Sequence, residues 1–144
     1  MVDTSPDSVL YELDVDDCWA LLERGALGRL ALTTAGVVDI FPVNYAVDGR
    51  RILFKTSEGT KLAELTVHDQ VAFEIDGADD QAAWSVVVKG IARTLQRRMD
   101  LDRAEQRRIV SWLPTVKTRI VEIDPLEVTG RAFVRGPEPD SEWY

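Results

Sequence analysis

The stretch RLALTTAGVVDIFPVNYAVDGRRILFKT, residues 29–56, decides the fold class. It predicts three strands: Arg29–Thr34, in which apolar and polar residues alternate, the long run Val37–Val47, and Arg51–Thr56, which returns beside it. Ala35-Gly36 between the first two runs is typical of a tight turn, and Asp48-Gly49 is a strong hairpin signal. Pro42 has no amide proton to donate to a sheet, so it predicts an edge position or a bulge in the second strand.

Outside this stretch the chain predicts further short strands and a few helices. The strands are expected over Gln70–Ile75, Trp84–Thr94, Thr118–Ile123 and Glu127–Phe133. The helices are expected over Val15–Leu22, with Asp14 as its cap and Gly25 as its stop, over Gly59–Val67 and over Arg97–Ser111. An acidic loop is expected over Asp76–Gln81, and loose segments over residues 1–13 and 136–144. Because closure removes exposed edges, six to seven antiparallel strands with few helices predict one mainly β domain, residues 1–144, folded as a small barrel.

The composition excludes several classes of function. Of the 144 residues, 45% are apolar, which is typical of a globular domain. Seventeen basic and 25 acidic residues give a net charge of −8, which argues against a nucleic-acid partner because phosphate binding needs a basic face. Cys18 is the only cysteine, so neither an internal disulfide nor a cysteine-pair metal site is predicted, and no metal ion is expected. With no signal-peptide pattern and no apolar run of about 18 residues, we expect a cytoplasmic protein without a membrane segment.

The segment that ends the third strand carries the most specific chemistry. In FKTSEGTK, residues 54–61, a strand ends, a short loop follows and a helix begins. Free backbone amides and the positive end of a helix dipole favour an anion at such a place. The side chains expected to bind a phosphate are Lys55, Thr56, Ser57, Thr60 and Lys61, while Gly59 would let the backbone approach it. The residues alone leave open a plain strand–loop–helix connection with solvated lysines.

A second segment could form a wall for a planar ring. Residues 39–45, DIFPVNY, are an apolar strand that is interrupted by a proline and closed by an amide. Phe41, Pro42, Val43 and Asn44 would lie along the ring, and Asn44 and backbone groups would reach its heteroatoms. A core strand with an edge bulge is the alternative that the residues leave open. Dinucleotide-binding, P-loop, zincin and serine-elbow motifs are absent, so no catalytic residue is assigned, and Tyr45 is the best placed candidate for a proton donor.

In their order, these segments resemble the pyridoxamine 5'-phosphate oxidase-like family of FMN-binding split β-barrels. The resemblance is closest to the small actinobacterial-type members and to the nitroimidazole-resistance flavoproteins. It covers about residues 8–95, through CWALL at 18–22, GRLA at 28–31, PVNY at 42–45, ILFKT at 52–56, GTK at 59–61 and WSVVVKG at 84–90.

The resemblance implies both an assembly and a binding site. Members of the family form homodimers with two flavin sites at the interface. By similarity, the flavin phosphate is held by Lys55, Thr56, Ser57 and Lys61, and the ring lies along Phe41, Pro42, Val43 and Asn44. Trp84 and Ser85 approach the same site, often from the partner chain.

The chain departs from the vitamin-metabolising oxidase itself. The ends of the ring-binding strand are basic in that enzyme and are Asp39 and Asn44 here, and its C-terminal tryptophan and arginine pattern is not evident. We therefore expect a flavin-dependent oxidoreductase with FMN that acts on a small planar substrate, and not pyridoxamine phosphate oxidation. Relatives that use a deazaflavin coenzyme, or that bind haem or other tetrapyrroles, keep those cofactors open. A non-catalytic flavin carrier or sensor, and a barrel that serves only as an interaction domain, are the alternative functions.

Overall fold

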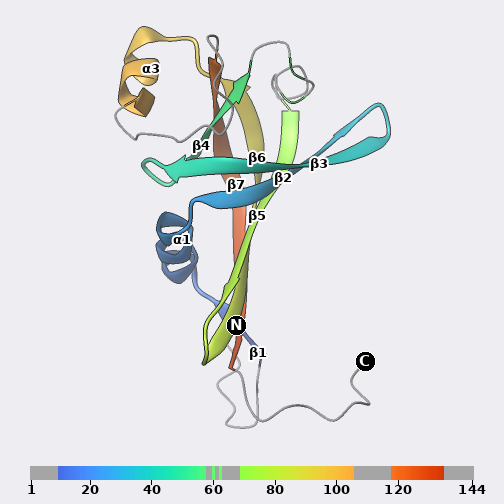
Figure 1. Cartoon of the computed structure of the whole chain (residues 1–144), viewed down its shortest axis with the longest axis vertical. Helices are drawn as coiled ribbons and strands as arrows, with labels where there is room; N and C mark the ends of the chain where they lie inside the picture. The colour runs from blue at the N-terminus through green and yellow to red at the C-terminus, as the bar shows by residue number, and fades with distance from the viewer. Residues whose placement is uncertain (1–9, 58–59, 61, 63–68, 106–117, 135–144) are drawn as a thin grey trace.

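Among the residues that the structure describes, seven antiparallel strands form one sheet that closes on itself, with two helices outside it (Figure 1). The computed structural model describes residues 10–57, 60, 62, 69–105 and 118–134. The strands are β1 Leu10–Leu13, β2 Leu27–Thr34, β3 Val37–Val47, β4 Ile52–Ser57, β5 Asp69–Ala78, β6 Ala82–Thr94 and β7 Thr118–Val134, and the helices are α1 Val15–Arg24 and α3 Arg98–Glu105. Their order is β1-β7-β4-β3-β2-β5-β6, and β6 also pairs with β7. Six strands therefore close a barrel, and β1 adds a further strand beside β7. Among the described residues, no helix is long and apolar enough to cross a membrane.

The strands predicted from residues 29–56 are confirmed, whereas three other expectations are corrected. Leu10–Leu13 is not a loose segment, because it pairs with β7 as strand β1. The expected loop over Asp76–Gln81 is shorter, since β5 continues to Ala78 and β6 already begins at Ala82. The two separate strands expected at 118–123 and 127–133 are one strand of 17 residues. The expected helix over 59–67, apart from Thr60 and Leu62, and residues 106–111 and 136–144 lie outside the described part.

A bulge makes this long β7 strand possible. Lys89 pairs with Glu127 and Gly90 pairs with Pro125, so Leu126 is an extra residue in β7. Before the bulge, the odd-numbered residues of β7 point into the barrel. After the bulge, the even-numbered residues do. Gly90 lies so close to β7 that a Cβ atom there would overlap the carbonyl oxygen of Asp124. The strand thus crosses Pro125 without ending, which the sequence pattern did not indicate.

Helix α1 packs its apolar stripe onto one end of the barrel, as the 3.6-residue period predicts. The Asp14 side chain accepts a hydrogen bond of 2.8 Å from the amide of Asp17, which confirms the expected N-cap. Cys18, Trp19 and Leu22 are buried. The helix therefore covers this end of the core with the apolar side chains that its sequence period predicts to be buried.

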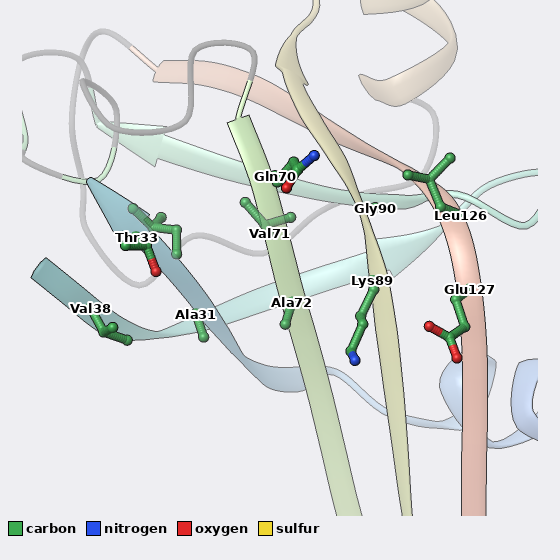
Figure 2. A pocket seen from close by; sticks show the side chains of 11 residues that line it. Ala31, Thr33, Val38, Gln70, Val71, Ala72, Lys89, Gly90, Leu126 and Glu127 are labelled. Atoms are coloured by element: carbon green, nitrogen blue, oxygen red, sulfur yellow. The ribbon is translucent and has the colours of Figure 1, made fainter. Parts of the chain in front are cut away.

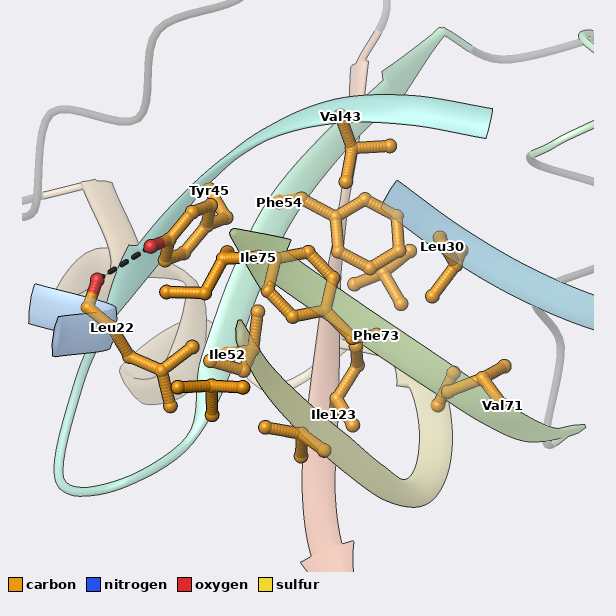
Figure 3. Packing of buried hydrophobic residues seen from close by; sticks show 14 of the residues in the cluster. Leu22, Leu30, Val43, Tyr45, Ile52, Phe54, Val71, Phe73, Ile75 and Ile123 are labelled. Atoms are coloured by element: carbon orange, nitrogen blue, oxygen red, sulfur yellow. Dashed lines mark hydrogen bonds between the residues drawn. The ribbon is translucent and has the colours of Figure 1, made fainter. Parts of the chain in front are cut away.

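The core fills the barrel interior with aliphatic and aromatic side chains (Figure 3). Phe54 and Phe73 are fully buried, and the rings of Tyr45 and Phe73 meet edge to face with centroids 4.9 Å apart. Leu62 packs against this cluster, as expected of its position. A second, smaller cluster lies outside the barrel wall, where Leu53 and Ile120 pack against Leu95 and Ala104 near α3.

Beside this second cluster a buried carboxylate is surrounded by three arginines. The Glu122 side chain is 1% exposed, and its Oε1 accepts a hydrogen bond of 2.8 Å from Nη2 of Arg93. Arg51 and Arg103 approach its two oxygens at 3.8 and 3.6 Å. Arg103 belongs to α3 and also pairs with Asp48 in the β3–β4 turn at 2.9 Å. Through these ion pairs, Glu122 of β7 links α3 to β6 and to the turn between β3 and β4.

Candidate functional site

The candidate site lies where strands β3 and β4 separate. The two strands pair only from Tyr45–Phe54 to Val47–Ile52. Beyond this point, β3 continues beside β2 and β4 continues beside β7 (Figure 1). Within the described residues no strand fills the space between them. We call this opening the fork; it is bordered by residues 40–44 of β3 and 55–57 of β4.

The backbone directs polar groups into the fork. In the β3–β4 turn, the amide of Asp48 donates to the carbonyl of Arg51 at 2.9 Å, and the amide of Arg51 donates to the carbonyl of Asp48 at 3.0 Å. Because amide direction alternates along an antiparallel strand, the amides of Lys55 and Ser57 point toward β3. The amide of Tyr45 points the other way, to the carbonyl of Ala26 at 3.0 Å, so the nitrogen of Pro42 faces the fork. Pro42 thus lies on an open edge, which confirms the expectation of an edge position.

Thr56 brings a buried hydroxyl to the end of the barrel interior next to the fork. Its side chain is 3% exposed, and among the described residues its Oγ1 has no hydrogen-bond partner. Such a group is costly to bury, because it loses its hydrogen bonds to water. Arg119 lies directly across from Thr56 on β7, and it already takes part in another interaction within the chain. Sequence reasoning missed Arg119, since only the register of β7 against β4 places it here.

The other side chains expected to bind the phosphate either already interact within the chain or lie outside the described residues. Lys55 and Ser57 are half-buried at the fork, and each already has an interaction within the chain. The Thr60 hydroxyl donates its proton to the carbonyl of Ser57 at 2.6 Å, so it can only accept from a ligand. Lys61 and Gly59, which carried part of the sequence argument, lie outside the described residues.

The expected ring wall divides between the two faces of β3. Val43 is buried in the core, and Phe41 packs against that core. Only Pro42 and Asn44 present their side chains to the outside of the barrel, because strand side chains alternate. A ring on the outer side would therefore meet these two side chains and the backbone of Phe41 and Val43.

Tyr45 cannot serve as the proton donor that the sequence suggested. Its hydroxyl is inside the core and donates a hydrogen bond of 2.6 Å to the carbonyl of Leu22 at the end of α1 (Figure 3). Burial raises the pKa of Tyr45 to about 12. The side chain is therefore a structural cap for the helix, and its proton is held away from any ligand.

Trp84 and Ser85 do not reach the fork of their own chain. Thr94 of β6 pairs with Val121, which pairs in turn with Phe54 beside the fork. Trp84 is ten residues before Thr94, about 33 Å along β6, although it lines a pocket with Leu27, which pairs with Asn44 of β3. The structure therefore places Lys55, Thr56, Ser57, Pro42 and Asn44 on the borders of the fork, whereas Trp84 and Ser85 lie toward the other end of β6.

A groove of about 410 Å³ lies on the outer face of the sheet between these two places (Figure 2). Val38 and Leu126 are exposed beside it, at 65% and 73% of their surface. Lys89 and Glu127 point from neighbouring strands toward the same side, as Figure 2 shows, and no ion pair joins them. The groove thus combines exposed apolar side chains with two charges that lack a partner among the described residues.

Fold and site together define a split β-barrel with an open fork in its wall. The family model described as pyridoxamine 5'-phosphate oxidase matches residues 14–132. The chain belongs to this family, as its motifs indicated.

Three solved structures show how far the similarity extends. The FAD-binding protein from Mycobacterium smegmatis is 41% identical with a TM-score of 0.80, covering 87% of this chain and 99% of that one. A candidate pyridoxamine 5'-phosphate oxidase from Corynebacterium glutamicum is 35% identical with a TM-score of 0.85, covering 93% of this chain and all of that one. A candidate 5-nitroimidazole antibiotic resistance protein from Bacteroides thetaiotaomicron is 9% identical with a TM-score of 0.71, covering 88% of this chain and 90% of that one, and shares the fold alone.

Proposed function

We propose that the fork binds a flavin nucleotide through the flavin–ribityl–phosphate portion that FMN and FAD share. The observation that carries this proposal is the buried Thr56 hydroxyl, which lacks a partner among the described residues at the edge of an anion-friendly opening. The relative of 41% identity is an FAD-binding protein, which supports a flavin without choosing between FMN and FAD. The bound flavin would supply hydride transfer, and the chain would act as an oxidoreductase on a small planar substrate.

The residues at the fork fit this cofactor in two respects. The amides of Lys55 and Ser57, the Lys55 ammonium group and the Arg119 guanidinium group are donors suited to a phosphate. The open edge of β3 offers alternating backbone donors and acceptors, which suit the heteroatoms of the flavin ring. Asp39 supplies no such donor, so the phosphate is expected near β4.

Replacing Thr56 by valine tests the proposal, because it should act in opposite directions with and without flavin. Without flavin, the variant is expected to be at least as stable as the wild type, since a buried hydroxyl without a partner disappears. With flavin, affinity should fall by about tenfold, the value of one hydrogen bond to a charged group at about 1.5 kcal/mol. Titration of the flavin-free protein with FMN and with FAD, followed by flavin fluorescence, measures the affinity.

Thr94→Val is the matched control. Its hydroxyl is also buried without a partner among the described residues, but it lies on β6, which β7 separates from β4 at this level. The Thr94→Val substitution should leave flavin affinity unchanged. Equal affinities of wild type and Thr56→Val for both flavins would contradict the proposed site. Bleaching of the bound flavin by reduced nicotinamide, followed by reoxidation, supports the oxidoreductase, whereas a bound but inert flavin supports the carrier.

We further propose that a second copy of this chain covers the outer face of the sheet. Val37, Val38 and Ile40 of β3 are 57–65% exposed on the arm of β3 that borders the groove of Figure 2. Grouped apolar side chains of this kind are typical of an interface. The position of Trp84 and Ser85 toward the other end of β6 adds a reason, because by the resemblance these residues approach the flavin from the partner chain.

Solution mass tests this assembly. The chain of 16.1 kDa is expected to elute and scatter as a dimer. Ile40→Lys places a charge in the proposed interface and should shift the protein toward the monomer by at least tenfold in dissociation constant. Met99→Lys is the control. Met99 is 83% exposed on α3, so its replacement should leave the dissociation constant of the dimer unchanged. A monomeric wild type would contradict the proposal.

A further inference from the structure

Helix α3 packs beside the root of the fork, where β3 and β4 still pair. Ala104 of α3 and Leu53 of β4 are both 1% exposed in the smaller apolar cluster, and Ala46 of β3, which pairs with Leu53, packs against that cluster. Ile120 of β7 belongs to the same cluster and pairs with Lys55, the first residue of β4 that borders the fork. The cluster therefore connects α3 to both strands just before they separate.

Arg103 of α3 adds a charged bridge to this apolar contact. Its Nε atom lies 2.9 Å from Oδ2 of Asp48 in the β3–β4 turn, and its Nη2 atom lies 3.6 Å from Oε2 of Glu122 on β7. The Asp48 and Glu122 side chains are only 11% and 1% exposed, so salt and water screen these ion pairs less than pairs at the surface. Asp48 also closes the turn through its backbone hydrogen bonds with Arg51. The bridge thus ties the turn of the hairpin to the strand that supports β4.

The hairpin that carries the fork has little pairing of its own. β3 and β4 pair at three positions, whereas β3 pairs with β2 at eight and β4 pairs with β7 at six. Beyond the root, each border of the fork follows a different neighbouring strand, and a pair of strands by itself is only marginally stable. The spacing between the two borders therefore depends on the contacts that hold the hairpin at its root.

We infer that Arg103 is a positioning residue for the fork: by holding the β3–β4 turn against β7, it keeps the two borders at the spacing that a flavin needs. This inference rests on the proposed function. Among the described residues, the Arg103 side chain forms ion pairs with Asp48, Asp100 and Glu122, none of which borders the fork. Arg103 therefore acts through the hairpin and not on the ligand. Because coupling between two sites is reciprocal, bound flavin must also stabilise the docking of α3.

Replacing Arg103 by glutamine tests this role. Affinity for FMN and FAD is expected to fall about fivefold or more, the lower end of the range for coupled sites, and Arg103→Lys should restore part of the loss because it keeps the charge. Arg98→Gln is the control on the same helix, since Arg98 is 91% exposed and its ion pair with Asp102 stays within α3. Val88→Ala is the control for stability alone, because Val88 belongs to the barrel core and not to the cluster at α3. Neither control should change the flavin affinity of the folded protein, and equal affinities of Arg103→Gln and Arg98→Gln would overturn the inference.

Asp48→Asn removes the same bridge from its other end. Asparagine keeps the turn, because Asn-Gly favours hairpins as Asp-Gly does. The double variant Asp48→Asn/Arg103→Gln should lose less flavin affinity than the product of the two single fold-changes, as expected of two residues that share one interaction. A loss equal to that product would show that the two residues act separately and would overturn the bridge.

Hydrogen exchange separates failure of this inference from failure of the proposed function. In the wild type, added FMN or FAD should slow exchange in α3, and in Arg103→Gln this slowing should be lost. In flavin-free protein, Arg103→Gln should speed exchange at the amides of Asp48 and Arg51, and Arg98→Gln should not. A wild type that binds neither flavin would refute the proposed function, while the flavin-free comparison would still decide whether Arg103 holds the hairpin. Unchanged exchange at these two amides, or bound flavin that leaves exchange in α3 unchanged, would overturn the inference.

Discussion

Replacing Glu122 by glutamine is expected to lower the free energy of unfolding by about 3 kcal/mol, the lower end of the range for breaking a buried ion pair. The amide keeps the size of the side chain but removes the charge that Arg51, Arg93 and Arg103 share. Their side chains are 40–46% exposed and can turn partly to water, which keeps the loss from being larger. Urea unfolding followed by circular dichroism measures the change.

The neighbouring Asp124→Asn substitution provides the control. Asp124 is 57% exposed and lies 3.9 Å from Arg51, so its charge should contribute less than about 1 kcal/mol. Because Arg103 anchors α3, faster hydrogen exchange in α3 should accompany the Glu122 change and not the Asp124 change. A Glu122→Gln variant as stable as Asp124→Asn would show that the cluster adds little.

Replacing Gly90 by alanine should destabilise the fold by about 3 kcal/mol or prevent folding, because the new methyl group meets backbone and not a movable side chain. A Cβ atom at Gly90 would overlap the Asp124 carbonyl oxygen and lie 3.0 Å from Cα of Pro125. To make room, β6 and β7 would have to part at the bulge. Thermal unfolding measures the loss.

Gly36→Ala separates this packing effect from ordinary glycine preference. Gly36 has a φ of 80° in the β2–β3 turn, with nothing within 4 Å of the added atom. Alanine there should cost about 1 to 2 kcal/mol through its left-handed backbone alone. If the two variants lost equal stability, the close approach at the bulge would not be the cause.

The strands could be predicted wherever their pairing was local. Segment 29–34 alternates between apolar and polar residues, segments 37–47 and 51–56 are rich in β-forming residues, and turn residues separate the three, so the hairpins appear in the sequence itself. The four residues of β1 could not be predicted, because their stability depends on a partner about 120 positions later. The continuity of β7 was hidden by Pro125, which ends most strands but here lies at a bulge.

The candidate site was predicted in part for the same reason. Lys55, Thr56, Ser57, Pro42 and Asn44 border the same opening because one hairpin carries them all, and their role in binding stays a prediction. Arg119 was not considered because only long-range register brings it beside Thr56. The suggestion for Tyr45 failed because the sequence does not say which face of β3 meets the end of α1.

Pro42 has a consequence for how two barrels can join. An uncovered strand with free amides tends to recruit another strand, which can extend one sheet through many molecules. Here the missing proton interrupts the hydrogen-bonding rhythm in the middle of the exposed arm of β3. A second chain that met this edge could not pair with β3 through an unbroken ladder of backbone hydrogen bonds, so a contact between two copies here would rest on side chains.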